Sequence, residues 1–228
     1  MIEKSLKIIA HIKSDFPTKF GIPRQSGLCN LKSQIVFEKE YQNPVALRGI
    51  EDFSHLWLLW DFSENEKSDW SPTVRPPRLG GNKRVGVFAT RSPFRPNSIG
   101  LSSVKLERII KTEQNGLVLE VSGADLLDNT PIFDIKPYIP YTDCHPQAVG
   151  GFADDVFGDK LEVFIPEHLN QLVPTDKRSA LQEILASDPR PAYQNDENRI
   201  YAFEFSKLHI EFSVSKNTLT VTNVKNID

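Results

Sequence analysis

The segment from Arg75 to Ser102 combines residue types that suit the binding of a polyanion. It holds six basic residues, no acidic residue, four prolines and four glycines. The wider segment from Trp70 to Leu106 carries seven Lys and Arg side chains and no Asp or Glu, although the whole chain has a net charge of −3. This basic segment, residues 70–106, can bind a nucleic acid. Alternatively, its side chains form ion pairs with the acidic remainder of the chain.

Familiar metal and cofactor signatures are absent from the sequence. The five histidines form no metal-binding pattern, and no G-x-G-x-x-G lies between a strand and a helix, so we expect no metal and no dinucleotide fold. Cys29 and Cys144 have no C-x-x-C spacing, which favours a reducing, cytoplasmic setting. The N-terminal residues contain no apolar run long enough for a signal peptide or a membrane span, so we expect no membrane association.

The elements that must position these residues are mostly strands over residues 1–150. Alternating apolar runs separated by Gly and Pro turns predict a mainly β domain, a barrel or a sandwich. The run from Phe53 to Phe62 is apolar on both sides and predicts a fully buried strand. Prolines at 131, 137 and 140 exclude a helix there. The remaining predicted strands cover residues 5–14, 34–41, 83–90, 100–113 and 116–127.

The chain changes character after Gly151, and residues 160–228 predict a small α+β C-terminal domain. One helix has an apolar stripe at Leu181, Ile184 and Leu185, can be capped by Thr175 or Asp176, and ends before Pro189. Three alternating strands follow, over residues 199–205, 207–215 and 218–224.

Five patches occur together in this sequence: "KFGIPRQSGL", "DFSHLWLLWDFSE", the basic segment, "DLLDNTPIFDIKPYIPYTD" and "DPRPAY". Their order and spacing resemble those of the TsaA/TrmO-like family of methyltransferases, which use S-adenosyl-L-methionine (SAM) and act on tRNA. The resemblance implies a β-barrel SAM-binding domain in residues 1–150 and a homodimer with SAM close to the subunit interface. It also implies methylation of N6 of N6-threonylcarbamoyladenosine, next to the anticodon.

The resemblance implies a set of cofactor contacts within these patches. An arginine fork suits the carboxylate of SAM, so Arg24 or Arg91 could hold it, and Asp128 could accept hydrogen bonds from ribose hydroxyls or the ammonium group. Relatives often have Gly at Asn129, and Asn tolerates the same left-handed turn. Alternatively, "DNTP" is only a turn between strands and "PRQ" a plain loop. The expected contacts are Pro23, Arg24, Gln25, Ser63, Glu64, Arg91, Leu101, Asp128, Asn129, Thr130 and Pro131.

The other arginines of the basic segment are the expected contacts to the tRNA anticodon stem-loop. Arg75, Arg78, Arg84 and Arg95 would contact phosphates, whereas Phe94 or Trp70 could stack on bases. Loss of the N6 proton should precede or accompany methyl transfer, so a base is plausible. Asp134, Tyr138 and Asp143 are candidates, but the sequence assigns no catalytic residue. Two alternatives stay open: a non-catalytic RNA-binding barrel, and a SAM-dependent methyltransferase with another acceptor.

Overall fold

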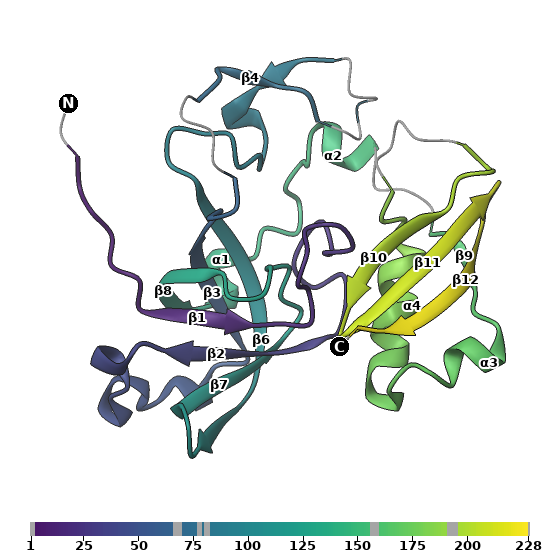
Figure 1. Ribbon diagram of the computed structural model, residues 1–228. Coiled ribbons are helices and arrows are strands. Elements are labelled where there is room, and N and C mark those ends of the chain that lie inside the picture. The colour runs from purple at the N-terminus through teal and green to yellow at the C-terminus, as the bar shows by residue number, and fades with distance from the viewer. Residues whose placement is uncertain are drawn as a thin grey trace.

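The fold is mainly β, as the sequence predicts. A computed structural model describes residues 3–65, 70–76, 79, 83–155, 160–190 and 196–227. Within them, a closed barrel, a four-stranded sheet and a two-stranded hairpin account for the strands (Figure 1). No described helix is long and apolar enough to cross a membrane.

Six antiparallel strands form the barrel in the order β1-β2-β7-β6-β3-β8, and β8 pairs with β1 to close it. Inward-facing side chains such as Ile35, Leu58 and Val104 fill the interior with a continuous apolar core. The strand bounds are β1 (Ala10–Lys13), β2 (Lys32–Phe37), β3 (His55–Asp61), β6 (Ile99–Thr112), β7 (Gly116–Ser122) and β8 (Pro131–Pro137).

Strand β3 is buried on one face only, which corrects the prediction of a strand buried on both sides. Leu56, Leu58 and Trp60 point into the barrel, whereas Trp57 and Leu59 are half-buried on its outer face. The physical reason is that successive side chains of a barrel strand alternate between interior and exterior, so only every second one enters the core.

The basic segment contains less strand than the sequence predicts. A short hairpin of β4 (Thr73–Val74) and β5 (Val85–Gly86) lies at the top of the barrel in Figure 1. The chain then forms the 3₁₀ helix η5 (Val87–Ala89), so only Val85 and Gly86 of the strand predicted over residues 83–90 are in a strand. Because β4 pairs through two residues only, the ladder ends at Gly86 and the chain turns instead.

Short helices connect the barrel strands. η1 (Lys39–Tyr41), η2 (Pro44–Leu47) and η3 (Ile50–Asp52) lie between β2 and β3. α1 (Pro140–Asp143) follows β8, although we expected Pro140 to exclude a helix. Proline is tolerated at the first helical position because the N–H that it lacks would have no helical partner there. α2 (Phe152–Asp155) comes next.

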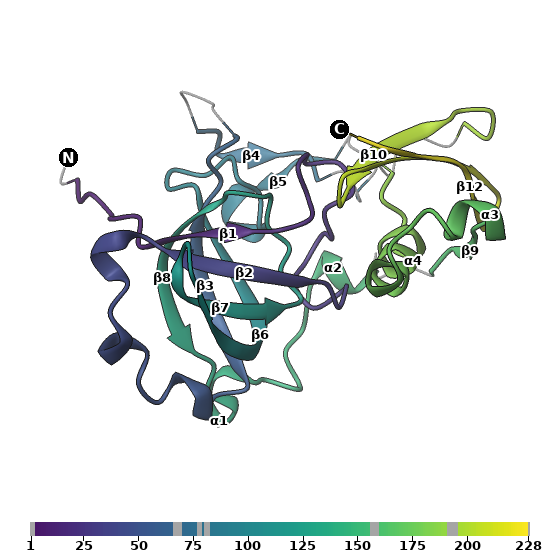
Figure 2. The same cartoon turned by 60° about the horizontal axis from the view of Figure 1, so that its bottom comes forward.

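The C-terminal part is a four-stranded sheet with a helix packed on one face, as Figures 1 and 2 both show. The order is β10-β11-β12-β9, with bounds β9 (Glu162–Phe164), β10 (Tyr201–Phe205), β11 (Leu208–Ser215) and β12 (Thr218–Asn226). α4 (Arg178–Ala186) buries Leu181, Ile184 and Leu185 as predicted. α3 (Glu167–Asn170) was not predicted.

The predicted cap of α4 is wrong. Thr175 and Asp176 belong to the 3₁₀ helix η6 (Thr175–Lys177), which runs directly into α4. The residue before α4, Lys177, already has helical backbone angles, and its side chain makes no capping hydrogen bond. A preceding 3₁₀ turn therefore replaces the side-chain cap.

Residues 15–31 cross from the barrel to the C-terminal sheet. Phe16, Cys29 and Leu31 are buried in the core formed by α4 and β10–β12, not in the barrel core. The Phe16 ring lies 5.9 Å from the Phe205 ring, centroid to centroid. The "PRQ" patch is thus attached to C-terminal residues, and the division at about residues 150–160 stays a prediction.

Candidate functional site

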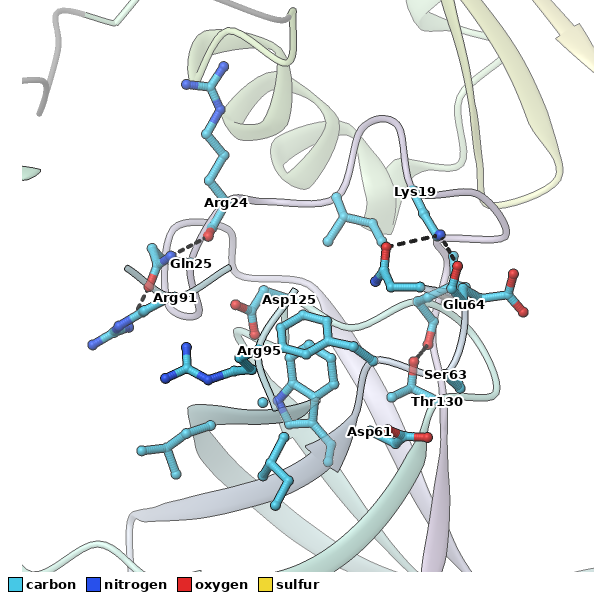
Figure 3. A pocket seen from close by; sticks show the side chains of 18 of the residues that line it. Lys19, Arg24, Gln25, Asp61, Ser63, Glu64, Arg91, Arg95, Asp125 and Thr130 are labelled. Carbon is cyan, nitrogen blue, oxygen red and sulfur yellow. Dashed lines mark hydrogen bonds between the residues drawn. The ribbon is translucent and has the colours of Figure 1, made fainter. Parts of the chain in front are cut away.

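A cavity of about 620 Å³ opens beside the end of β3 (Figure 3). Its walls come from four segments that are distant in sequence: residues 19–25, 60–65, 90–101 and 125–130. The volume lies within the range of small-molecule sites. The fold thus brings four of the five sequence patches to one place.

Most of the predicted cofactor contacts line this cavity. Asp128, Asn129 and Pro131 are not among the lining residues. The eight predicted residues that do line it are Pro23, Arg24, Gln25, Ser63, Glu64, Arg91, Leu101 and Thr130. Their individual contacts to a cofactor remain predictions.

Arg24 and Arg91 occupy different environments. The Arg24 guanidinium donates to the backbone carbonyls of Asp188, at 2.6 Å, and Arg190, at 2.8 Å. Figure 3 shows it pointing away from the other labelled side chains of the cavity. Arg91 donates to the Gln25 side-chain oxygen, and the Gln25 amide donates to the Arg24 carbonyl at 2.6 Å. Arg91 is therefore the better placed of the two to hold a carboxylate.

Ser63 and Glu64 form an exposed turn at the cavity rim. The turn is closed by a hydrogen bond from Asn65 N to Phe62 O, at 2.9 Å. Lys19 Nζ donates to the Glu64 carbonyl and, at 3.3 Å, to the Asn65 side chain. Lys19 was not predicted from the sequence, although it begins the "KFGIPRQ" patch.

The "DNTP" patch is a tight turn that is bonded to β1. Asn129 has the left-handed conformation expected for it, with φ of 64°. Asp128 accepts a hydrogen bond from Ser14 N at 2.9 Å, and Thr130 Oγ1 donates to Leu127 O at 2.8 Å. These contacts agree with the structural alternative for Asp128, since its carboxylate already holds the chain after β1.

Asp125, which we did not predict, places a half-buried carboxylate at the cavity. Its Oδ1 accepts a hydrogen bond from Ser102 Oγ at 2.6 Å, and Ser102 Oγ accepts one from Trp60 Nε1 at 3.0 Å. Burial raises the pKa of Asp125, although the Ser102 hydrogen bond and the charge of Arg91 oppose the rise. The sequence did offer a signal for Asp125, because it begins the patch that contains Asp128, three residues earlier in the chain.

The three candidate bases named from the sequence are not among the residues that line the cavity. Asp134 forms an ion pair with Lys136 at 2.9 Å. Asp143 accepts hydrogen bonds from Ile139 N and Trp57 Nε1, both at 2.9 Å, and these bonds lower its pKa. Tyr138 packs against Trp57, with ring centroids 5.4 Å apart.

The predicted phosphate contacts separate into two groups. Arg95 lines the cavity and donates to Thr90 O at 3.0 Å. Arg75 and Arg84 are exposed on the β4–β5 hairpin, and Arg84 donates to Thr73 Oγ1 at 3.0 Å. Arg78 lies outside the described residues.

The arginines of the basic segment remain without described acidic partners. Within the described ranges, no ion pair joins Arg75, Arg84, Arg91 or Arg95 to a carboxylate. Elsewhere, acidic residues do pair; Glu120, for example, contacts Arg108 at 3.0 Å. Ion pairing with the carboxylates that the structure describes therefore does not account for these arginines.

Two aromatic rings of the same basic segment are exposed. Trp70 is 52% exposed and Phe88 is 73% exposed. Their rings are stacked, with centroids 6.5 Å apart and planes inclined by 29°. An exposed aromatic pair next to cationic side chains is typical of a surface that binds single-stranded nucleic acid.

Comparison with known proteins assigns the chain to a family. The family model of the tRNA-methyltransferase O N-terminal domain matches residues 11–144, and that of the TrmO C-terminal domain matches residues 158–227. The chain belongs to the TrmO family. The resemblance inferred from the five patches is therefore confirmed.

Individual known proteins match over most of the chain. A "tRNA (adenine(37)-N6)-methyltransferase" from Escherichia coli is 40% identical, over 91% of this chain and 92% of its own length. An "S-adenosyl-L-methionine-binding protein" from Archaeoglobus fulgidus is 38% identical, over 64% of this chain and 96% of its own. A crystal structure of TrmO from Pseudomonas aeruginosa is 30% identical, covers 99% of this chain and 100% of its own, and has a TM-score of 0.76.

Proposed function

We propose that this protein is a SAM-dependent methyltransferase that methylates N6 of N6-threonylcarbamoyladenosine at position 37 of tRNA. The observation that carries the proposal is the similarity, over nine tenths of the chain, to a tRNA (adenine(37)-N6)-methyltransferase. The cavity adds independent support, because residues of four sequence patches meet in it.

The chemistry of the cavity fits SAM. Arg91 can hold the methionyl carboxylate as a planar fork. Asp61, whose Oδ1 accepts a hydrogen bond from Ser98 Oγ at 3.1 Å, is an acceptor for hydroxyl or ammonium groups. Phe62 and Leu101 supply apolar surface for the adenine. Bound SAM supplies a methyl group on a positively charged sulfur.

Asp125 is the group that we assign as the proton acceptor. The lone pair of the acceptor nitrogen is delocalised, so its proton must leave as the new N–C bond forms. The hydrogen bond from Ser102 fixes one oxygen of Asp125, and burial raises its pKa, which favours proton acceptance. Orientation of the two reactants supplies the remaining advantage.

The β4–β5 hairpin is the proposed contact surface for the anticodon stem-loop. Arg75 and Arg84 are exposed without described ion-pair partners, which suits phosphate binding. Trp70 and Phe88 offer ring faces for unstacked bases of the loop. Phosphate contacts would position the tRNA, while the cavity would select the nucleoside.

We also propose that the active form is a homodimer in the cytoplasm. Leu101 is 54% exposed and Ile99 is 37% exposed, and both line the cavity. Leu59, opposite Leu101 on β3, extends this apolar strip along the outer face of the barrel. A second copy seated on the strip would cover the edge of the cavity. Sedimentation at micromolar concentration tests this, and a stable monomer would contradict it.

The decisive experiment is methyl transfer in vitro. Purified protein is incubated with labelled SAM and with tRNA that does or does not carry the threonylcarbamoyl group, and the nucleosides are analysed by mass spectrometry. We expect one added methyl group, only on the modified tRNA. Absence of SAM binding would leave a non-catalytic RNA-binding module, and methylation of another nucleoside would identify a different acceptor.

A further inference from the structure

The loop that carries the "PRQ" patch is attached on its outer side to the C-terminal sheet. Gly21, with φ of 97°, lies so close to β10 that a Cβ atom there would be 2.3 Å from the Phe203 ring. Farther along, Asn30 N donates to the Glu183 carboxylate of α4 at 2.8 Å. Both ends of residues 21–30 are therefore held by C-terminal elements.

The middle of this loop is held by the "DPR" part of the "DPRPAY" patch. Arg24 donates to the carbonyls of Asp188 and Arg190. Two local features orient these carbonyls. Asp188 has a left-handed backbone, with φ of 50°. The Arg190 guanidinium donates two hydrogen bonds to the Asp188 carboxylate, from Nε at 2.8 Å and from Nη2 at 2.9 Å. Arg190 is only 9% exposed.

The same loop reaches the cavity on its inner side. The Arg24 carbonyl accepts from Gln25, and the Gln25 oxygen accepts from Arg91. A continuous series of hydrogen bonds thus runs from Arg190 through Arg24 and Gln25 to Arg91. Its two ends are 99 residues apart in sequence, and the bond between Arg24 and Arg190 joins residues that are 166 apart.

We propose that the C-terminal "DPR" turn positions the SAM-binding loop, with Arg190 acting as a positioning residue through Arg24. This rests on the proposed function only in that the cavity is taken to bind SAM. The buried ion pair of Arg190 and Asp188 holds the backbone carbonyls of these two residues at a spacing that the Arg24 guanidinium can bind. These bonds fix the loop and, through it, the side chains of Gln25 and Arg91. Pre-organised loops bind ligands more tightly because less conformational entropy is lost on binding.

Arg190→Ala, measured by calorimetry with SAM alone, tests the proposal. We expect the SAM dissociation constant to rise about tenfold, the effect of one charged hydrogen bond. Arg199→Ala is the matched control. Both arginines lie over the Tyr201 ring, Arg190 at 5.9 Å and Arg199 at 5.3 Å, but Arg199 is exposed and outside the hydrogen-bond series. We expect the control to bind SAM as the wild type does. In steady-state assays of Arg190→Ala, the KM for SAM should rise more than kcat falls.

The double variant Arg24→Ala with Arg190→Ala separates positioning from a general structural effect. If Arg190 acts through Arg24, the double variant binds SAM no more weakly than Arg24→Ala alone. Additive losses, or equal SAM affinity in Arg190→Ala and wild type, would overturn the proposal.

Two further results keep the test decisive. If Arg190→Ala does not fold, Asp188→Asn weakens the same ion pair while keeping a residue that tolerates the left-handed backbone, and the same rise is expected. If the wild type itself binds no SAM, the proposed function is contradicted. If the wild type and the variants bind SAM equally well, only the positioning role of Arg190 is contradicted.

Discussion

Gly100→Ala should destabilise the protein and disturb the cavity together, because Gly100 faces the buried Trp60 ring. A Cβ atom at Gly100 would lie 2.2 Å from Trp60 Cε2, whereas ordinary contact begins near 3.4 Å, so the ring must move by about 1.2 Å. That shift strains the barrel core and pulls Trp60 Nε1 from Ser102, which it contacts at 3.0 Å. Overpacking costs about 1–3 kcal/mol, and an unsatisfied buried donor costs about 1–3 kcal/mol.

The expected loss is therefore about 3 kcal/mol of the free energy of unfolding. For a chain of this length that corresponds to a fall of roughly 6–12 °C in the melting temperature, measured by calorimetry or circular dichroism. Methyl transfer should slow as well, since Ser102 orients Asp125. Gly86→Ala is the control: no described atom lies within 4 Å of the position that its added methyl group would take, and its φ is −59°. Equal melting temperatures for the two variants would refute the packing explanation.

Three other predictions concern the surface and the cavity. Arg75→Ala and Arg84→Ala should each flatten the slope of log tRNA affinity against log salt by about 0.7–0.9 and leave SAM affinity unchanged; an unaltered slope would exclude phosphate contacts. Trp70→Ala and Phe88→Ala should each weaken tRNA binding by about 1–3 kcal/mol in a filter-binding assay, again without loss of SAM affinity. Asp125→Asn should slow methyl transfer by at least about 100-fold. Because the folded-state pKa of Asp125 is raised, the stability that its protonated form contributes is lost as pH rises through that pKa. Asp125→Asn should thus exceed the wild type in urea stability at neutral pH, with a gap that closes as the pH falls below the pKa of Asp125; a gap independent of pH would contradict the assignment.

The sequence by itself determined the class of fold and the family. Alternating apolar residues separated by Gly and Pro are a local signal, since neighbouring side chains of a strand face opposite sides. The stripe of Leu181, Ile184 and Leu185 predicted α4 for the same reason. Local signals failed where an adjacent element determined the structure. The 3₁₀ helix η6 replaced the predicted side-chain cap of α4, and β5 is short because its partner β4 pairs through two residues only.

The tertiary structure alone decided what each charged residue of the site does. Asp125 and Asp128 stand three residues apart in one patch, yet Asp125 lines the cavity and Asp128 holds Ser14. Arg24 and Arg91 both suit a carboxylate by type, but the Arg24 guanidinium binds backbone carbonyls 164 and 166 residues away. The direction of a side chain depends on partners that the folded chain brings next to it, and no local pattern in the sequence encodes contacts over such separations.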